Sequence, residues 1–210
     1  MAAWIEMIGD ADAGPELREA LDRARTPHST VDNVMRVHSL RPNTMHGHVT
    51  LYRAALHNAT NTITPWLQEA VSSYVSVLND CAYSYANHWK NAAHLIGDAD
   101  RAGEIETDLQ AHKPEQAIEG AELALMRYAE KLTLFPGDMV EADVAALRDA
   151  GLDDGAILEA NQIICYFNYV NRSINGLGVT TAGDIVGYLS LIHISEPTRR
   201  RGISYAVFCL

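Results

Sequence analysis

An all-α fold is predicted for this chain by three features of its sequence. Apolar residues recur at the three- and four-residue spacing of an amphipathic helix along nearly the whole length. Prolines and most glycines fall between these periodic segments, and the alternation of Val or Ile with polar residues that is typical of strands is almost absent. We therefore predict a compact bundle of about nine helices, which forms one domain over residues 1–188.

The helices of the first half are placed by proline and cap signals. Proline fits the first position of a helix because the N–H group that it lacks would have no partner there. Thr64 before Pro65 is thus an N-cap followed by a first-turn proline, and Asn79 and Asp80 are cap residues that separate this helix from the next. The predicted helices of this half are 15–25, 31–40, 42–58, 65–78 and 81–96.

The helices of the second half are placed in the same way. Pro114 opens a long helix, and Asp153 or Asp154 caps the last one, which Gly176 ends. The sharpest turn signal lies at residues 135–138, but the segments on either side of it are too small for separate domains. The predicted helices of this half are 101–110, 114–134, 141–150 and 155–175.

Composition and charge exclude several classes of protein. The chain has 210 residues, 16 Lys and Arg against 27 Asp and Glu, and a net charge of −11, which argues against a nucleic-acid partner. No apolar run approaches the ~20 residues that a membrane helix needs, and the N-terminus lacks the positive region of a signal peptide. We therefore expect no membrane partner and a cytoplasmic location. Three cysteines are too few for a disulfide scaffold.

The C-terminal stretch is treated separately from the fold. Residues 189–199 resemble the translation of a sequencing adapter, so we expect residues 189–210 to be a non-native tail and the natural sequence to depart near Tyr188. Cys209 lies in this tail, which leaves Cys81 and Cys165 as the thiols of the protein itself.

Candidate chemistry lies between Glu69 and His88. On a helix that begins at Cys81, a rotation of about 100° per residue places Cys81, Ser84 and His88 on one face. Glu69 belongs to the preceding helix, from which its carboxylate could point inward toward them. The free N–H groups and dipole of a helix N-terminus, with an imidazolium nearby, would stabilise a Cys81 thiolate.

These residues resemble a known active-site signature. The alkylhydroperoxidase D-like (AhpD-like), carboxymuconolactone decarboxylase superfamily has a Glu, eleven residues, Cys-x-x-Cys and a His four residues later. Glu69, Cys81 and His88 stand in the same register, and Ser84 replaces the second cysteine. Residues 166–179 are similar to the C-terminal helix of the peroxidase-related members. The resemblance covers residues 41–188.

The resemblance implies an all-helical homo-oligomer with a thiol peroxidase relay. Its implied roles are proton relay for Glu69, redox thiol for Cys81, hydrogen-bond relay for Ser84, and acid or base for His88. The substrate would be a hydroperoxide and the reductant an external thiol, with no cofactor and no metal. Because Ser84 cannot form a sulfenic acid or close a disulfide, turnover would run through Cys81.

Two other functions remain open. His88 and Glu69 could perform acid–base chemistry on a small carboxylic acid or lactone, as the decarboxylases of the superfamily do, or the chain could be a non-catalytic helical assembly protein. Cys165 is interpreted as a core residue, with a resolving role as the alternative. His46 and His48 diverge by about 200° on a helix, so they cannot chelate one metal ion from it.

Overall fold

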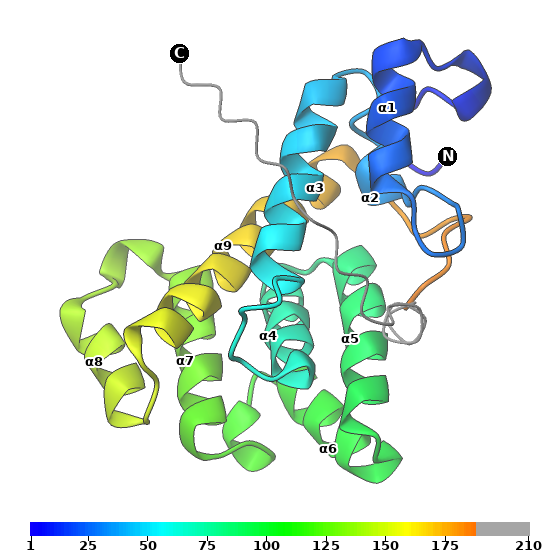
Figure 1. Cartoon of the computed structure of the whole chain (residues 1–210). Helices are drawn as coiled ribbons and strands as arrows, with labels where there is room; N and C mark the ends of the chain where they lie inside the picture. Colours follow the sequence, from blue (N-terminus) through cyan, green and yellow to red (C-terminus); the bar gives the residue numbers. More distant parts are fainter. Residues whose placement is uncertain (188–210) are drawn as a thin grey trace, which may run out of the picture.

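Within residues 1–187, which the computed structural model describes, the chain is helical and has no strand (Figure 1). The proposed adapter-derived tail and Cys209 lie outside these residues. The α-helices of this part are α1 (Pro15–Ala24), α2 (Asn33–Arg36), α3 (Pro42–Leu56), α4 (Pro65–Leu78), α5 (Ala82–Ile96), α6 (Ala99–Gln110), α7 (Gly120–Leu134), α8 (Glu141–Asp149) and α9 (Asp154–Leu177). Short 3-10 turns occur at Asp10–Asp12, Pro114–Gln116 and Pro136–Asp138.

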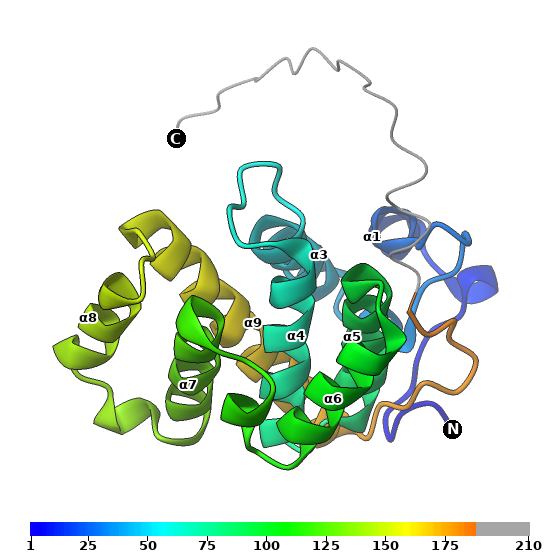
Figure 2. The ribbon, with the colours of Figure 1, turned by 90° about the horizontal axis from the view of Figure 1, so that it is seen from below.

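Helix α4 is the centre of the bundle. It packs against α5, α7 and α9 (Figures 1 and 2), and residues 67–76 are buried without interruption. A helix that is buried on all sides must satisfy its polar side chains internally. The hydroxyls of Ser72, Ser73 and Ser76 do so by donating to the carbonyl four residues earlier, at 2.6, 2.7 and 2.8 Å. Glu69 therefore lies on an element that the surrounding helices hold on every side.

The N-terminal helices form a second, smaller core. Leu17 and Leu21 of α1 pack with Met45 and Val49 of α3, apart from the main cluster around α4. The N-terminal segment also joins the end of α9, since the Trp4 N–H donates to the Leu177 carbonyl at 2.8 Å. The region between the two cores is where side chains of α3, α5 and α9 face one another.

Four predicted boundaries are corrected. The helix expected over 114–134 is a 3-10 turn followed by α7, because Gly120 has a φ of +58° and the Ala117 carbonyl accepts a hydrogen bond from Arg101 of α6. The helix expected over 31–40 is only α2, after which the chain turns. Helix α9 continues through Gly176 and ends at Gly178, whose φ is +60°.

The fourth correction concerns the start of α5. Cys81, and neither Asn79 nor Asp80, is its N-cap residue. Helix α4 ends in a Schellman motif, in which the Cys81 N–H donates to the Ser76 carbonyl at 2.8 Å and the Asp80 N–H to the Val77 carbonyl at 3.0 Å. Asp80 is the left-handed residue of the motif, with a φ of +50°.

Candidate active site

Glu69 and His88 form a direct contact across the α4–α5 interface. The His88 Nδ1 atom lies 2.7 Å from Oε2 of Glu69, and the Asn91 amide donates to the same oxygen at 3.4 Å. Glu69 is 3% exposed, so its carboxylate is almost fully shielded from bulk water. Because the carboxylate accepts the proton on Nδ1, the neutral ring carries its free lone pair on Nε2.

The imidazole of His88 is held from a second direction by α9. The Phe167 ring meets it edge to face, with ring centroids 4.6 Å apart and an interplanar angle of 85°. Phe167 is fully buried, which fixes its own position. The His88 ring is therefore held in one orientation by a hydrogen bond and an aromatic contact.

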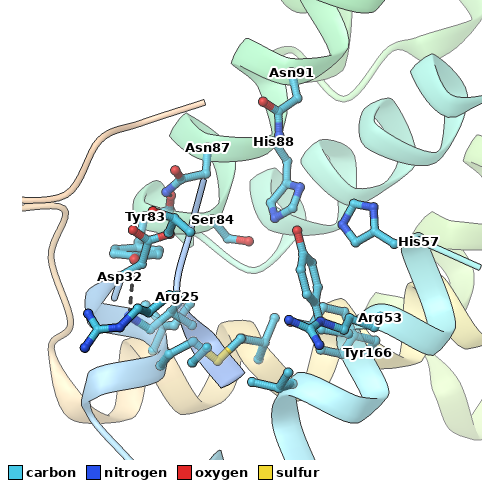
Figure 3. A pocket seen from close by; sticks show the side chains of 18 of the residues that line it. Arg25, Asp32, Arg53, His57, Tyr83, Ser84, Asn87, His88, Asn91 and Tyr166 are labelled. Carbon is cyan, nitrogen blue, oxygen red and sulfur yellow. Dashed lines mark hydrogen bonds between the residues drawn. The ribbon is translucent and has the colours of Figure 1, made fainter. Parts of the chain in front are cut away.

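A cavity of about 590 Å³ opens beside His88. Figure 3 shows the His88 ring directed from α5 into this space, with His57 and Arg53 across from it. The wall on the α5 side contains Tyr83, Ser84, Asn87, His88 and Asn91, and the opposite side contains Tyr52, Arg53, His57 and Tyr166. The cavity combines aromatic and apolar surface with a few polar groups, which is the usual character of a small-molecule site.

Cys81 does not line this cavity. Cys81 is only 1% exposed. Ser84 and His88 are part of the cavity wall, but Cys81 is not. The cavity wall therefore contains two of the three residues that were predicted to share a face. Cys81 precedes the first helical residue and has φ −100° and ψ 84°, so the helix rotation that relates Ser84 to His88 does not apply to it.

The Cys81 thiol also differs from the expected thiolate. Burial raises its pKa above the ordinary value, although the backbone N–H groups of Ser84 and Tyr83 act in the opposite direction. The desolvation effect is the larger one. As the residue that completes the Schellman motif of α4, Cys81 packs its side chain inward, which explains the burial.

The remaining sequence expectations have mixed outcomes. Cys165 is exposed on α9, so the prediction that it is a core residue is wrong. His48 is buried and His46 is partly buried, and no group of three or more His, Cys, Asp or Glu side chains within residues 1–187 is placed to hold a metal. No helix in the same range is both long and apolar enough to cross a bilayer.

Sequence reasoning missed the tyrosines of the cavity. Burial raises the pKa of Tyr52, and the carboxylates of Glu69 and Asp32 raise it further, so its phenol stays neutral. Burial likewise raises the pKa of Tyr166. These residues come from α3 and α9, far from the Glu69–His88 segment, and no local spacing relates them to it. The only signal was that Tyr166 opens the second segment that resembles the superfamily.

Comparisons with known proteins identify the architecture. A crystal structure of the alkylhydroperoxidase AhpD core, an uncharacterized peroxidase-related protein from Ralstonia eutropha JMP134, matches with a TM-score of 0.74 and 19% identity, over 86% of this chain and 93% of that one. The chain has the AhpD-like fold. A peroxidase-related protein from Silicibacter sp. TM1040 matches with a TM-score of 0.72 and 17% identity, over 85% and 91% of the two chains.

A third AhpD-like structure is an enzyme with a bound ligand. It is a cysteine-to-alanine variant of the debrominase Bmp8 in complex with 2,3,4-tribromopyrrole, with a TM-score of 0.67 and 15% identity over 83% of this chain and 89% of that one. No family profile and no curated protein sequence matches the chain. At these identities the comparison establishes the fold alone.

Proposed function

We propose that this AhpD-like protein performs acid–base chemistry on a small carboxylic acid or lactone in the cavity beside His88. The observation that carries the proposal is the 2.7 Å contact between His88 Nδ1 and the buried Glu69, which leaves the other ring nitrogen for a substrate. Ser84, Asn87 and Asn91 supply polar groups on the same wall. A debrominase with a similar fold was crystallised in complex with 2,3,4-tribromopyrrole, a small molecule, which is consistent with this use of the cavity.

The reaction would begin when Nε2 of His88 removes a proton from a carbon next to the substrate carbonyl. The electron pair of the C–H bond stays on the substrate as an enolate, and the ring becomes an imidazolium. Glu69 stabilises that cation because its charge is buried and in contact with the ring. The imidazolium then returns the proton to another carbon of the enolate, which completes an isomerisation without any net change of charge.

The test is the isomerisation of α-angelica lactone, a small unsaturated lactone, to its conjugated isomer, followed by ultraviolet absorbance. We expect His88→Gln to lower the rate at least about 100-fold, the usual contribution of a general base. His94→Gln is the matched control, since His94 is exposed on the same helix outside the cavity wall. A wild-type rate in His88→Gln, or no turnover of this lactone and of related keto acids by the wild type, would contradict the proposal.

A second candidate is a hydroperoxide-consuming peroxidase that uses Cys81 and an external thiol. It is favoured by the N–H groups of Ser84 and Tyr83, which lower the pKa of the Cys81 thiol, and by the peroxidase-related neighbours. The thiolate would attack one peroxide oxygen, forming a sulfenic acid and releasing an alcohol. The external thiol would then reduce the sulfenic acid to the Cys81 thiol. The burial of Cys81 makes this candidate the weaker one.

The two candidates separate in an assay with tert-butyl hydroperoxide and dithiothreitol. The acid–base proposal predicts equal peroxide consumption by the wild type and Cys81→Ser. It also predicts that Ser84→Cys, which places a thiol in the cavity wall, raises consumption. Loss of wild-type consumption in Cys81→Ser would instead establish the peroxidase.

A further inference from the structure

A chain of hydrogen bonds runs from Tyr166, in the cavity wall, to the protein surface. The Tyr166 hydroxyl lies 2.8 Å from Nε2 of His48, and Nδ1 of His48 lies 3.0 Å from Nε2 of His38. Nδ1 of His38 in turn lies 2.8 Å from the hydroxyl oxygen of Thr44. His48 is buried, with 2% of its surface exposed, whereas Thr44 lies at the protein surface.

The direction of every bond in this chain follows from its outer end. The Thr44 hydroxyl donates to the Arg41 carbonyl at 2.8 Å, and a carbonyl can only accept. Thr44 therefore accepts from His38, which carries its proton on Nδ1 and accepts on Nε2. His48 must then donate from Nδ1 and accept from the Tyr166 hydroxyl on Nε2. Burial lowers the pKa of both histidines, to about 3 for His48, which keeps both rings neutral as this arrangement requires.

We propose that His48 and His38 are positioning residues of a proton relay. This relay makes Tyr166 a second proton-exchanging group of the cavity, in addition to His88. The inference rests on the proposed acid–base function and deepens it. Because the Tyr166 proton points to His48, a substrate group that reaches the phenol oxygen meets only lone pairs. The relay thus selects a substrate that presents an O–H or N–H donor to Tyr166.

The proton balance of the relay is closed. The phenol oxygen takes the substrate proton while its own proton passes to Nε2 of His48. His48 releases its Nδ1 proton to His38, and His38 releases its Nδ1 proton to Thr44. The Thr44 hydroxyl proton leaves its bond to the Arg41 carbonyl and passes to water. The substrate keeps the electron pair of its O–H or N–H bond and gains one negative charge. Tyr166 and both histidines are neutral before and after, and each histidine has changed its tautomer.

The relay is tested first without any catalytic assay. Full-length protein labelled with ¹⁵N-histidine gives multiple-bond ¹H–¹⁵N spectra that show which ring nitrogen carries the proton. At pH 7.5 we expect His38 and His48 to be neutral and protonated on Nδ1, with signals assigned by His38→Gln and His48→Gln. We expect Tyr166→Phe to shift the Nε2 signal of His48. A proton on Nε2 of either ring would overturn the relay.

The second test uses the ketonisation of the enol form of phenylpyruvate, a keto acid whose enol O–H can donate to the phenol oxygen of Tyr166. We expect His48→Gln and Tyr166→Phe to lower kcat about tenfold, as the loss of one transition-state hydrogen bond does, with KM unchanged. The solvent isotope effect on kcat should fall in both variants. His46→Gln is the control, because His46 lies on the same helix outside the relay and the cavity wall. Wild-type kcat and isotope effect in His48→Gln would overturn the role of the relay.

The two proposals fail separately. If His88→Gln leaves isomerisation unchanged while the tautomers are as expected, the acid–base function fails and the hydrogen-bond chain stands. If the tautomers are reversed while His88→Gln abolishes turnover, the relay fails and the function stands.

Discussion

The buried carboxylate of Glu69 is hydrogen-bonded chiefly by one neighbour. His88 supplies a short contact at 2.7 Å and Asn91 only a long one at 3.4 Å. Removing the partner of a buried charge is costly because the charge that remains is desolvated and uncompensated. The site therefore also contributes to the stability of the α4–α5 interface.

This dependence predicts the stability of two variants. His88→Ala should lower the free energy of unfolding by about 3 kcal/mol, because Glu69 is left buried without its main partner. The double variant Glu69→Gln/His88→Ala should recover part of that loss, since the charge is gone. Urea unfolding at pH 7 measures both. A double variant that is less stable than His88→Ala would contradict the explanation.

The two cysteines of the described part should differ sharply in reactivity. Burial raises the pKa of both thiols, but Cys81 is only 1% exposed, whereas Cys165 is exposed. We expect iodoacetamide to alkylate Cys81 at least about 100-fold more slowly than Cys165 at pH 8, since reaction requires local opening. Peptide mass spectrometry follows both sites, and urea should abolish the difference. Similar rates in the folded protein would show that the sulfur is accessible.

At this scale the sequence predicted the pair but not the cysteine. Glu69 and His88 lie within regular helices on either side of one turn, so their meeting follows from helix geometry. Cys81 lies in the turn itself, where the backbone leaves the helix and periodicity carries no information. The contact of Tyr166 with His48 joins residues 118 positions apart, and no local pattern reports such a contact.

Helix α9 carries Phe167 and Tyr166 to the site, and its N-terminus is fixed by a single side chain. Asp153 accepts from the Ala156 N–H at 2.8 Å, while Asp154 only pairs with the half-exposed Arg148. The sequence allowed either acid as the cap. The structure selects Asp153 because its backbone is extended, with φ −79° and ψ 169°, as an N-cap requires.

The two neighbouring acids therefore form a matched pair of variants. Asp153→Ala should lower the free energy of unfolding by about 1 kcal/mol, the usual value of an N-cap hydrogen bond. Asp154→Ala should change it by less than about 0.5 kcal/mol, because it removes only an exposed ion pair. Thermal unfolding followed by circular dichroism checks both. An equal loss in the two variants would show that Asp153 does not act as the cap.

Elements were predictable where apolar periodicity and a stop signal agreed, as in α4 and α5. Elements were not predictable where a tertiary contact interrupts a segment of helical periodicity. The stretch between Pro114 and α7 has helical spacing, but Ile118 is buried and the Ala117 carbonyl is bound by Arg101 of α6. These contacts favour a turn over the helix that local propensity favours.

The assembly of the whole molecule remains a prediction. The resemblance to the superfamily implies a homo-oligomer, and large apolar side chains are exposed at the end of α7 (Phe135), at the start of α8 (Val140) and on α9 (Leu158). We expect light scattering coupled to size-exclusion chromatography to give a mass of at least twice that of one chain. A monomer at micromolar concentration would contradict this expectation.

The buried histidine of the relay makes the whole fold sensitive to acid. The pKa of His48 is lowered from 6.5 to about 3 by burial and by the neighbouring His38, whereas the unfolded chain recovers the ordinary value. Between these values only the unfolded state binds the proton. Protonation of His48 therefore does not reduce the free energy of unfolding above about pH 6.5. As the pH falls from there toward 3, this free energy decreases with a slope that approaches about 1.4 kcal/mol per pH unit.

A comparison of variants isolates this contribution from those of the carboxylates. We expect the free energy of unfolding, measured in urea between pH 7 and pH 4.5, to fall less steeply in His48→Gln than in the wild type, by about 1 kcal/mol per pH unit. His94→Gln is the control and should keep the wild-type slope, because His94 is exposed and lies outside the relay. Parallel slopes for His48→Gln and the wild type would mean that His48 is charged in the folded protein. The relay requires the neutral ring, so the same titration tests the chemistry of the cavity through the stability of the fold.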